Sequence, residues 1–222
     1  MNSIYLPPHG ILEDFAHDKK LLRKQSLGLR KKTFHDDTNR INDELSSGIT
    51  TQSMKVLSPL TAPTVCAYTP RLEEPGNFAW LDSLSATCER LFLPLSKPGG
   101  HLKWGEYQGR SSMVTGPYNI PEPATVTPQL FTTKPGVDVI FIPATAVDKH
   151  GGRLGHGAGF YDRTLATLRR AEKGHHLPKL PLLVGVVYDH EVVTSIPLEE
   201  HDQLLDIIVT PTQMYFCTTS DA

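Results

Sequence analysis

The stretch Asp148-Lys-His-Gly-Gly-Arg-Leu-Gly-His-Gly-Ala-Gly-Phe-Tyr-Asp162 is the part of this 222-residue chain that says most about its fold. Glycine loses much conformational freedom on folding, so a cluster indicates positive φ angles or close approach of a ligand to the backbone. The β-branched run 137–142 precedes the stretch, and residues 161–172 follow a helical pattern. A strand, a glycine loop and a helix N-terminus together predict a phosphate-binding site. Its glycines are Gly151, Gly152, Gly155, Gly157 and Gly159.

The spacing of these glycines excludes two familiar nucleotide-binding motifs. A Walker loop ends in Gly-Lys-Ser/Thr, and no lysine follows the glycines here. A dinucleotide fingerprint needs Gly-x-Gly-x-x-Gly directly after a strand, whereas Phe160 stands where the third glycine belongs. A glycine-rich surface connection without a ligand is the remaining alternative. Arg153 and the Tyr161-Asp162 pair favour the ligand site.

Composition and charge are typical of a compact enzyme. The net charge of −2 gives no reason to expect nucleic acid as a partner. Residues 1–15 lack a secretory signal pattern, and no apolar stretch approaches the roughly 20 residues of a membrane helix. Cys66, Cys88 and Cys217 are too few and too widely spaced for a disulfide framework or a CxxC zinc site. We therefore expect a cytoplasmic monomer that binds neither nucleic acid nor membrane.

Hydrophobic patterns divide the chain into alternating strands and helices. Residues 14–46 predict one or two helices, and 101–108 with 112–115 predict a hairpin or an irregular excursion. Alternation of this kind predicts a single three-layer α/β domain over residues 14–222, with a mostly parallel central sheet flanked by helices. Residues 1–13 are expected to form a loose leader. Strands are predicted at 65–68, 90–95, 137–142, 181–188 and 207–210, and further helices at 78–88 and 161–172.

Charged residues outside the glycine stretch have both a functional and an ordinary interpretation. Lys19 and Arg23 lie four residues apart, so on a helix both can reach one anion, although such pairs are usually solvated. Glu74 follows the strand at 65–68, at the edge where α/β sheets bind ligands, but a loop glutamate is ordinarily only solvated charge. Asp202 and Asp206 could cap or flank an element.

Two aromatic residues could form a stacking wall for a flat heterocycle. Tyr118 lies beside the proline-stiffened segment 117–123, and Trp104 belongs to the excursion before it. Aromatic side chains can equally cover a hydrophobic core, and the residues alone do not decide between the two.

The glycine stretch resembles the signature of the 5-formyltetrahydrofolate cyclo-ligase family, also called methenyltetrahydrofolate synthetases. The resemblance extends over nearly all of the chain after residue 18 and implies a three-layer α/β fold. It also implies conversion of 5-formyltetrahydrofolate to 5,10-methenyltetrahydrofolate, with ATP as co-substrate and release of ADP and phosphate. The matching residues are Pro143, Asp148, Gly151, Arg153, Leu154, Gly155, Gly157, Gly159, Phe160, Tyr161 and Asp162.

The resemblance implies a role for each group of residues named above. Lys19, Arg23 and Arg153 are the implied catalytic cations at the ATP phosphates. Asp162 and Asp202 are the implied ligands of Mg²⁺, which needs only one or two carboxylates in addition to water and phosphate. The remaining implied ATP-binding residues are Lys20, Leu21, Leu22, Leu154, Gly155, His156, Gly157, Ala158, Gly159, Phe160 and Tyr161. The implied folate-binding residues are Thr69, Glu74 (on the pterin), Tyr118, Phe160 and Tyr161.

His156 and Ala158 depart from the family pattern. Many members have arginine and lysine at these positions, so two cationic contacts to phosphate are missing, or a protonated His156 takes their place. A nucleotide- or folate-binding relative without turnover is therefore a second hypothesis, although the cations and carboxylates of the motif are retained. A NAD-dependent dehydrogenase is disfavoured by the glycine spacing.

Overall fold

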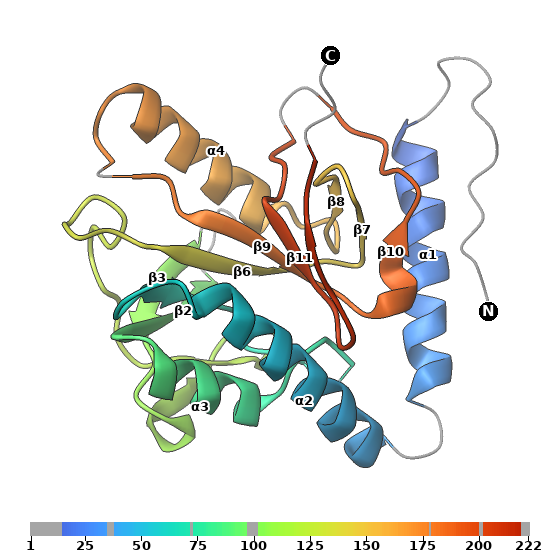
Figure 1. Ribbon diagram of the computed structural model, residues 1–222, viewed down its shortest axis with the longest axis horizontal. Coiled ribbons are helices and arrows are strands. Elements are labelled where there is room, and N and C mark those ends of the chain that lie inside the picture. The colour runs from blue at the N-terminus through green and yellow to red at the C-terminus, as the bar shows by residue number, and fades with distance from the viewer. Residues whose placement is uncertain are drawn as a thin grey trace.

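The computed structural model describes residues 15–34, 38–71, 73–96, 102–177, 179–199 and 202–218. Its main feature is a seven-stranded sheet in the order β12-β11-β9-β6-β1-β2-β3 (Figure 1). The expected leader 1–13, and His101 and His201 of the predicted segments, lie outside the described residues.

The five inner strands of this sheet are parallel, and its two edge strands are antiparallel to their neighbours. Strands buried on both faces are uniformly apolar, which is why the sequence shows continuous apolar runs instead of alternation. The mostly parallel sheet is thus confirmed. The inner strands are β1 (Thr64–Cys66), β2 (Arg90–Ser96), β6 (Val139–Pro143), β9 (Leu182–Val186) and β11 (Ile207–Val209), and the edges are β3 (Leu102–Glu106) and β12 (Met214–Phe216).

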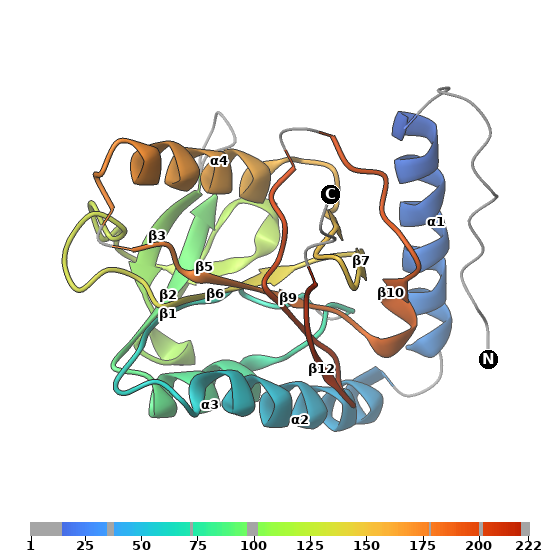
Figure 2. The same cartoon turned by 45° about the horizontal axis from the view of Figure 1, so that its top comes forward.

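Helices cover both faces of the sheet, as Figure 2 shows. Helices α2 (Thr38–Leu57) and α3 (Phe78–Thr87) lie on one face, where Trp80 packs edge-on against Phe141 at a centroid distance of 5.8 Å. Helix α4 (Phe160–Lys173) lies on the other face and buries its Leu165–Leu168 side. The three-layer α/β architecture is confirmed. None of the described helices is both long and apolar enough to cross a membrane.

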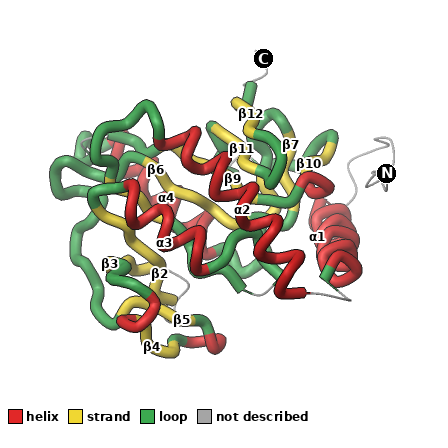
Figure 3. The backbone as a smooth tube through the Cα atoms, turned by 60° about the horizontal axis from the view of Figure 1, so that its bottom comes forward, coloured by secondary structure: helices red, strands yellow, loops and turns green. Residues whose placement is uncertain are grey.

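Helix α1 (Phe15–Thr33) stands beside the main sheet and packs on a smaller one (Figure 3). That sheet has the order β10-β7-β8, formed by Val192–Val193, Ala146–Asp148 and Arg153–Leu154. Leu22 of α1 joins a small core with Ala146, Leu154, Val193 and Ile196. The N-terminal helix is thereby held against the glycine stretch.

Some elements differ from the sequence prediction. The two halves of the predicted excursion do not pair with each other: β3 pairs with β2, and β4 (Met113–Thr115) pairs with β5 (Pro121–Pro123). Strands β7 and β8 interrupt the expected single glycine loop, and β12 was not expected. Three short 3₁₀ turns complete the described chain at Arg110–Ser112, Pro117–Asn119 and Asp189–Glu191.

Candidate active site at the glycine loop

The glycine stretch divides into a mostly buried hairpin and an open loop. In the hairpin, the backbone N–H groups of His150 and Gly152 donate to Asp148 Oδ1 at 2.9 Å, and that of Ile196 donates to Oδ2 at 2.6 Å. Gly151 has φ 91°, and a Cβ there would lie 2.5 Å from the carbonyl oxygen of Leu205. These residues shape the turn and have their polar groups satisfied within the protein.

The open loop runs from Gly155 into the N-terminus of α4. Gly159 starts the helix with φ 68°, a left-handed conformation that favours glycine, and no described side chain caps the first turn. His156, Gly157 and Ala158 are exposed. A helix start without a side-chain cap has N–H groups and a positive dipole end available to an anion.

The cations of α1 reach this region. Arg23 Nε donates to the carbonyl oxygen of Gly155 at 2.8 Å, so α1 is tied directly to the loop. Lys19 Nζ lies 3.0 Å from Asp202 Oδ2 and 3.1 Å from Glu199 Oε2. Burial by itself lowers the pKa of Lys19, but hydrogen bonds to Asp202 and Glu199 outweigh it and raise the pKa. The lysine is therefore charged.

Arg153 and Asp162 form a second ion pair, with the arginine side chain almost completely buried. Arg153 Nε is buried and has no hydrogen-bond partner among the described residues. Each aspartate expected to bind metal is therefore paired with a cation expected to bind phosphate. No group of three or more His, Cys, Asp or Glu gathers within the described residues, but two carboxylates fit Mg²⁺ when phosphate and water supply the other ligands.

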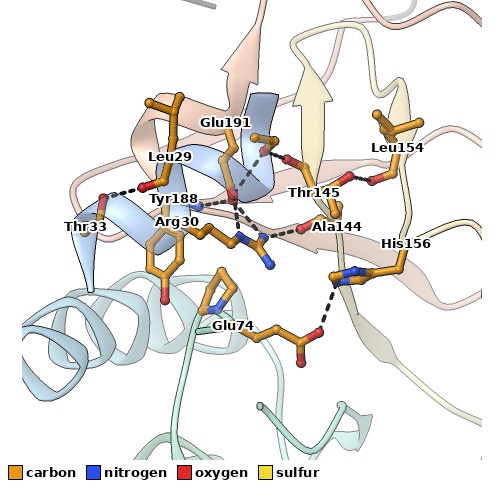
Figure 4. Close-up of polar contacts among 12 residues, drawn as sticks. Leu29, Arg30, Thr33, Glu74, Ala144, Thr145, Leu154, His156, Tyr188 and Glu191 are labelled. Carbon is orange, nitrogen blue, oxygen red and sulfur yellow. Dashed lines mark hydrogen bonds and ion pairs between the residues drawn. The ribbon is translucent and has the colours of Figure 1, made fainter. Parts of the chain in front are cut away.

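Glu74 lies buried opposite the loop (Figure 4). Its carboxylate accepts a hydrogen bond from the backbone N–H of Arg71 at 3.0 Å, and its Oε1 lies 3.1 Å from His156 Nε2. Burial by itself raises the pKa of Glu74, but the hydrogen bonds from His156 and Arg71 outweigh it and hold the pKa below its usual range. Glu74 is an ionised acceptor, and His156 faces it.

Several buried polar atoms near Glu74 lack a partner among the described residues: Thr69 Oγ1, Tyr161 Oη and Tyr188 Oη. Burial raises the pKa of both tyrosines, and the charge of Glu74 raises it further, so both hydroxyls are neutral donors. Unpaired buried polar groups are costly, and a bound polar ligand would satisfy them. Tyr188 escaped the sequence prediction, although its place at the end of the strand predicted at 181–188 put it at the ligand edge.

The other predicted residues differ in how far they are exposed. Lys20 and Leu21 are exposed, whereas Leu22 and Leu154 have fully buried side chains in the small core. Tyr118 is 73% exposed in the turn after β4, so its ring is open to solvent. Phe160 is half-buried at the start of α4, and Ala158 lies exposed in the loop. Trp104 is a core residue that packs edge-on against Phe131 at 5.8 Å.

The fold and site define a three-layer α/β protein with an anion-binding loop that faces a buried carboxylate. The model of the 5-formyltetrahydrofolate cyclo-ligase family matches residues 16–211. The chain belongs to that family.

Similar proteins agree with this assignment. The 5-formyltetrahydrofolate cyclo-ligase of Mycolicibacterium smegmatis is 38% identical over 158 residues, which cover 68% of this chain and 75% of the relative. The cyclo-ligase of Escherichia coli is 29% identical and covers 78% of this chain and 91% of its own length. The solution structure of Aquifex aeolicus 5,10-methenyltetrahydrofolate synthetase superposes with a TM-score of 0.68 at 24% identity, covering 92% of this chain and 94% of that one. This last likeness concerns the fold.

Proposed function

We propose that the protein is an ATP- and Mg²⁺-dependent 5-formyltetrahydrofolate cyclo-ligase. One observation carries the proposal: a single loop contacts both sets of expected ligand groups. At Gly155 the loop accepts a hydrogen bond from Arg23 of the cationic helix, and at His156 it faces the carboxylate of Glu74. A nucleotide on one side of this loop and a pterin on the other would lie next to each other.

The reaction needs activation of a formamide, because its nitrogen lone pair delocalises into the carbonyl group. The formyl oxygen attacks the γ-phosphorus of ATP, the bond to the β–γ bridging oxygen breaks, and ADP leaves. N10 then attacks the carbon of the resulting imidate phosphate, N10 loses its proton, and phosphate leaves with the formyl oxygen. The product is 5,10-methenyltetrahydrofolate. Such chemistry depends mostly on alignment of the two substrates and on charge neutralisation.

The ion pairs at the loop support this assignment of roles. Lys19, Arg23 and Arg153 are the groups that would hold the phosphates, and Asp162 and Asp202 would hold the metal ion. Bound Mg²⁺ would neutralise phosphate charge in such a site. When a nucleotide binds, its phosphates would replace the carboxylates as partners of Lys19 and Arg153. The positive charges of the two side chains would therefore be compensated both without and with the nucleotide.

Glu74 is the group that would orient the folate. An ionised carboxylate accepts two hydrogen bonds from the N–C–N donor edge of a pterin, and charge-assisted bonds of this kind are the strong ones. Thr69 and Tyr161 offer further unpaired hydroxyls beside it. His156 would give up its contact with Glu74 when a pterin binds there.

A spectroscopic assay tests the proposal. With 5-formyltetrahydrofolate, ATP and Mg²⁺, we expect a near-ultraviolet band of the methenyl product to grow, and we expect no growth when ATP is left out or a strong chelator is added. Added NAD should make no difference. Turnover without nucleotide would exclude the ligase mechanism. Binding of both ligands without turnover would favour the non-catalytic alternative. Cytoplasmic location and a monomeric state remain predictions from the sequence.

A further inference from the structure

One polar stripe of α1 makes contacts with four separate segments of the chain. Its members are Lys19, Arg23, Ser26 and Arg30, spaced by four, three and four residues, so they share one face of the helix. Lys19 and Arg23 contact the 199–202 segment and the glycine loop, as described above. Ser26 and Arg30 contact a different place, the turn Asp189–Glu191 and the segment before β7.

Arg30 and Glu191 form a completely buried ion pair at this second place (Figure 4). Arg30 Nε lies 2.5 Å from Glu191 Oε1, and Nη2 lies 3.0 Å from Oε2, which is the two-pronged geometry of a guanidinium on a carboxylate. Nη2 also donates to the carbonyl oxygen of Ala144 at 2.6 Å. The pair joins α1 to two loops that lie more than 100 residues away in sequence.

The ion pair has additional partners that fix its orientation. The backbone N–H of Tyr188 donates to Glu191 Oε2 at 2.9 Å, and Ser26 Oγ lies 3.2 Å from Oε1. The same Ser26 hydroxyl donates to the carbonyl oxygen of Thr145. The segment Ala144–Thr145 leads directly into β7, the first strand of the hairpin that carries the glycine loop. The network therefore connects α1, which carries Lys19 and Arg23, to β7, the strand that leads toward the glycine loop.

Stability alone gives little reason for a buried pair at this place. Desolvating two charges costs about as much as their attraction returns, and apolar residues of similar volume often do as well or better. A two-pronged pair with three further hydrogen bonds, to Ala144, Tyr188 and Ser26, differs from an apolar contact in another respect: its directional bonds restrict the rotation and translation of the helix. Lys19 and Arg23 lie on the same helix, two to three turns before Arg30.

We infer that Arg30 and Glu191 are positioning residues for the nucleotide, which set the register of α1 so that Lys19 and Arg23 face the Gly155–Gly159 loop. The inference rests on the proposed function, in which these two cations hold ATP. It assigns no contact with substrate to Arg30 or Glu191. A small displacement of α1 would move both cations together, and misplacement of catalytic groups by about 1 Å can cost on the order of 100-fold in rate.

The experiment is calorimetric titration of ATP with Mg²⁺, and separately of 5-formyltetrahydrofolate, into the double variant Arg30→Met with Glu191→Met. Removing both charges leaves no unpaired ion at this place, so we expect the variant to fold. Its melting temperature should be lower than that of the wild type, because the Tyr188 N–H and the Ala144 carbonyl lose their partners. The Kd for ATP should rise at least about fivefold. The Kd for folate should rise less than that, because the charge of Arg30 also helps to hold the pKa of Glu74 low. The surface pair Arg90–Glu106, at 2.7 Å between β2 and β3, supplies the matched control with the same two substitutions, and both affinities should stay unchanged.

Ser26→Ala provides a second variant that keeps both charges. It removes the hydroxyl between Glu191 and the Thr145 carbonyl, and we expect a two- to threefold weaker ATP affinity with folate affinity unchanged. If the double variant does not fold, the Ser26→Ala result decides. A purely structural role would lower the fraction of protein that binds both ligands and leave each Kd unchanged, and that result would overturn the inference. If wild-type protein binds no ATP at all, the proposed function fails instead.

Discussion

The hairpin half of the glycine stretch, Asp148–Leu154, and its loop half, Gly155–Asp162, are both rich in glycine but differ in what surrounds them. The hairpin is buried except at its tip, Lys149 and His150, and both oxygens of Asp148 accept hydrogen bonds from backbone N–H groups. The loop exposes its central residues 156–158 and leaves the start of α4 uncapped by any described side chain. In the hairpin half, the carboxylate of Asp148 and its N–H partners are hydrogen-bonded within the protein. In the loop half, N–H groups at the start of α4 are available to a ligand.

This difference separates two kinds of residue within one motif. A substitution in the hairpin should lower the free energy of unfolding. It should reduce ligand binding only because less of the protein is folded. A substitution in or opposite the loop should act on ligand affinity and leave the free energy of unfolding nearly unchanged. Arg153 belongs to both halves, because its backbone lies in β8 and its guanidinium is paired with Asp162.

The largest expected effect is on the hairpin side, for Asp148→Ala. The change leaves three N–H donors, those of His150, Gly152 and Ile196, without their acceptor, and at about 1 kcal/mol each or more it should lower the free energy of unfolding by about 3 kcal/mol. Urea denaturation measures this directly. Folded variant at low temperature should bind ATP and folate nearly as the wild type does.

Asp43→Ala, at an exposed carboxylate that accepts a hydrogen bond from Asn77, is the control and should change stability by less than about 1 kcal/mol. A stable Asp148→Ala protein with lost ligand affinity would contradict the division of the motif. Asp148 would then belong with the ligand-binding residues.

The layers and the inner strands were predictable because strands that are buried on both faces of a sheet have continuous apolar sequences. The runs at 65–68, 137–142 and 207–210 became β1, β6 and β11 within two residues or so. Strands β7 and β8 were not predictable, since each has only two or three residues and glycines lie between and after them. Their stability comes from Asp148 and from Leu22 of a distant helix, which no local pattern contains.

The site was predictable where the resemblance supplied residues, and not where pairing is long-range. The contact of Arg23 with Gly155 joins two segments that had both been named, although nothing in the sequence indicated their direct bond. The sequence assigns no role to Arg30 or Glu191, because they are 161 positions apart and each looks like ordinary surface charge. A usable indication existed in the spacing of Lys19, Arg23 and Arg30, which places three cations on one face of a helix.

A smaller effect is expected for Glu74→Gln, opposite the loop half. The variant keeps the shape of the side chain but replaces an acceptor oxygen by an amide donor, which leaves a pterin N–H unpaired at a cost of about 1–3 kcal/mol. The Kd for 5-formyltetrahydrofolate should rise about tenfold, and the Kd for ATP should hardly change. The neighbouring exposed Glu73→Gln serves as control. Equal losses for both ligands would place Glu74 outside the folate site.

The smallest effect is expected for His156→Ala, inside the loop half. The sequence makes His156 a candidate for the missing phosphate contact, and that hypothesis stays a prediction. The structure shows its Nε2 3.1 Å from Glu74, where it helps to keep the pKa of that carboxyl low. Removing the imidazole should therefore raise the pKa of Glu74. Near pH 8 Glu74 is ionised in both proteins, and folate affinity should differ by less than about threefold.

The pH dependence of kcat/KM distinguishes His156→Ala from the wild type more clearly than their folate affinities near pH 8 do. Folate recognition needs ionised Glu74, so kcat/KM for folate should decline as pH falls toward the pKa of this group in the free enzyme. Because that pKa is lowered in the wild type and should rise in His156→Ala, the decline should begin at a higher pH in the variant. The ratio of the two proteins at each pH, from about pH 8 to about pH 5, cancels changes in the substrate itself. His150→Ala, at an exposed histidine of the hairpin half, should follow the wild-type curve. If the His156→Ala curve also coincides with it, the contact with Glu74 has no electrostatic consequence. If instead only the ATP affinity of His156→Ala falls, His156 belongs to the residues that contact phosphate.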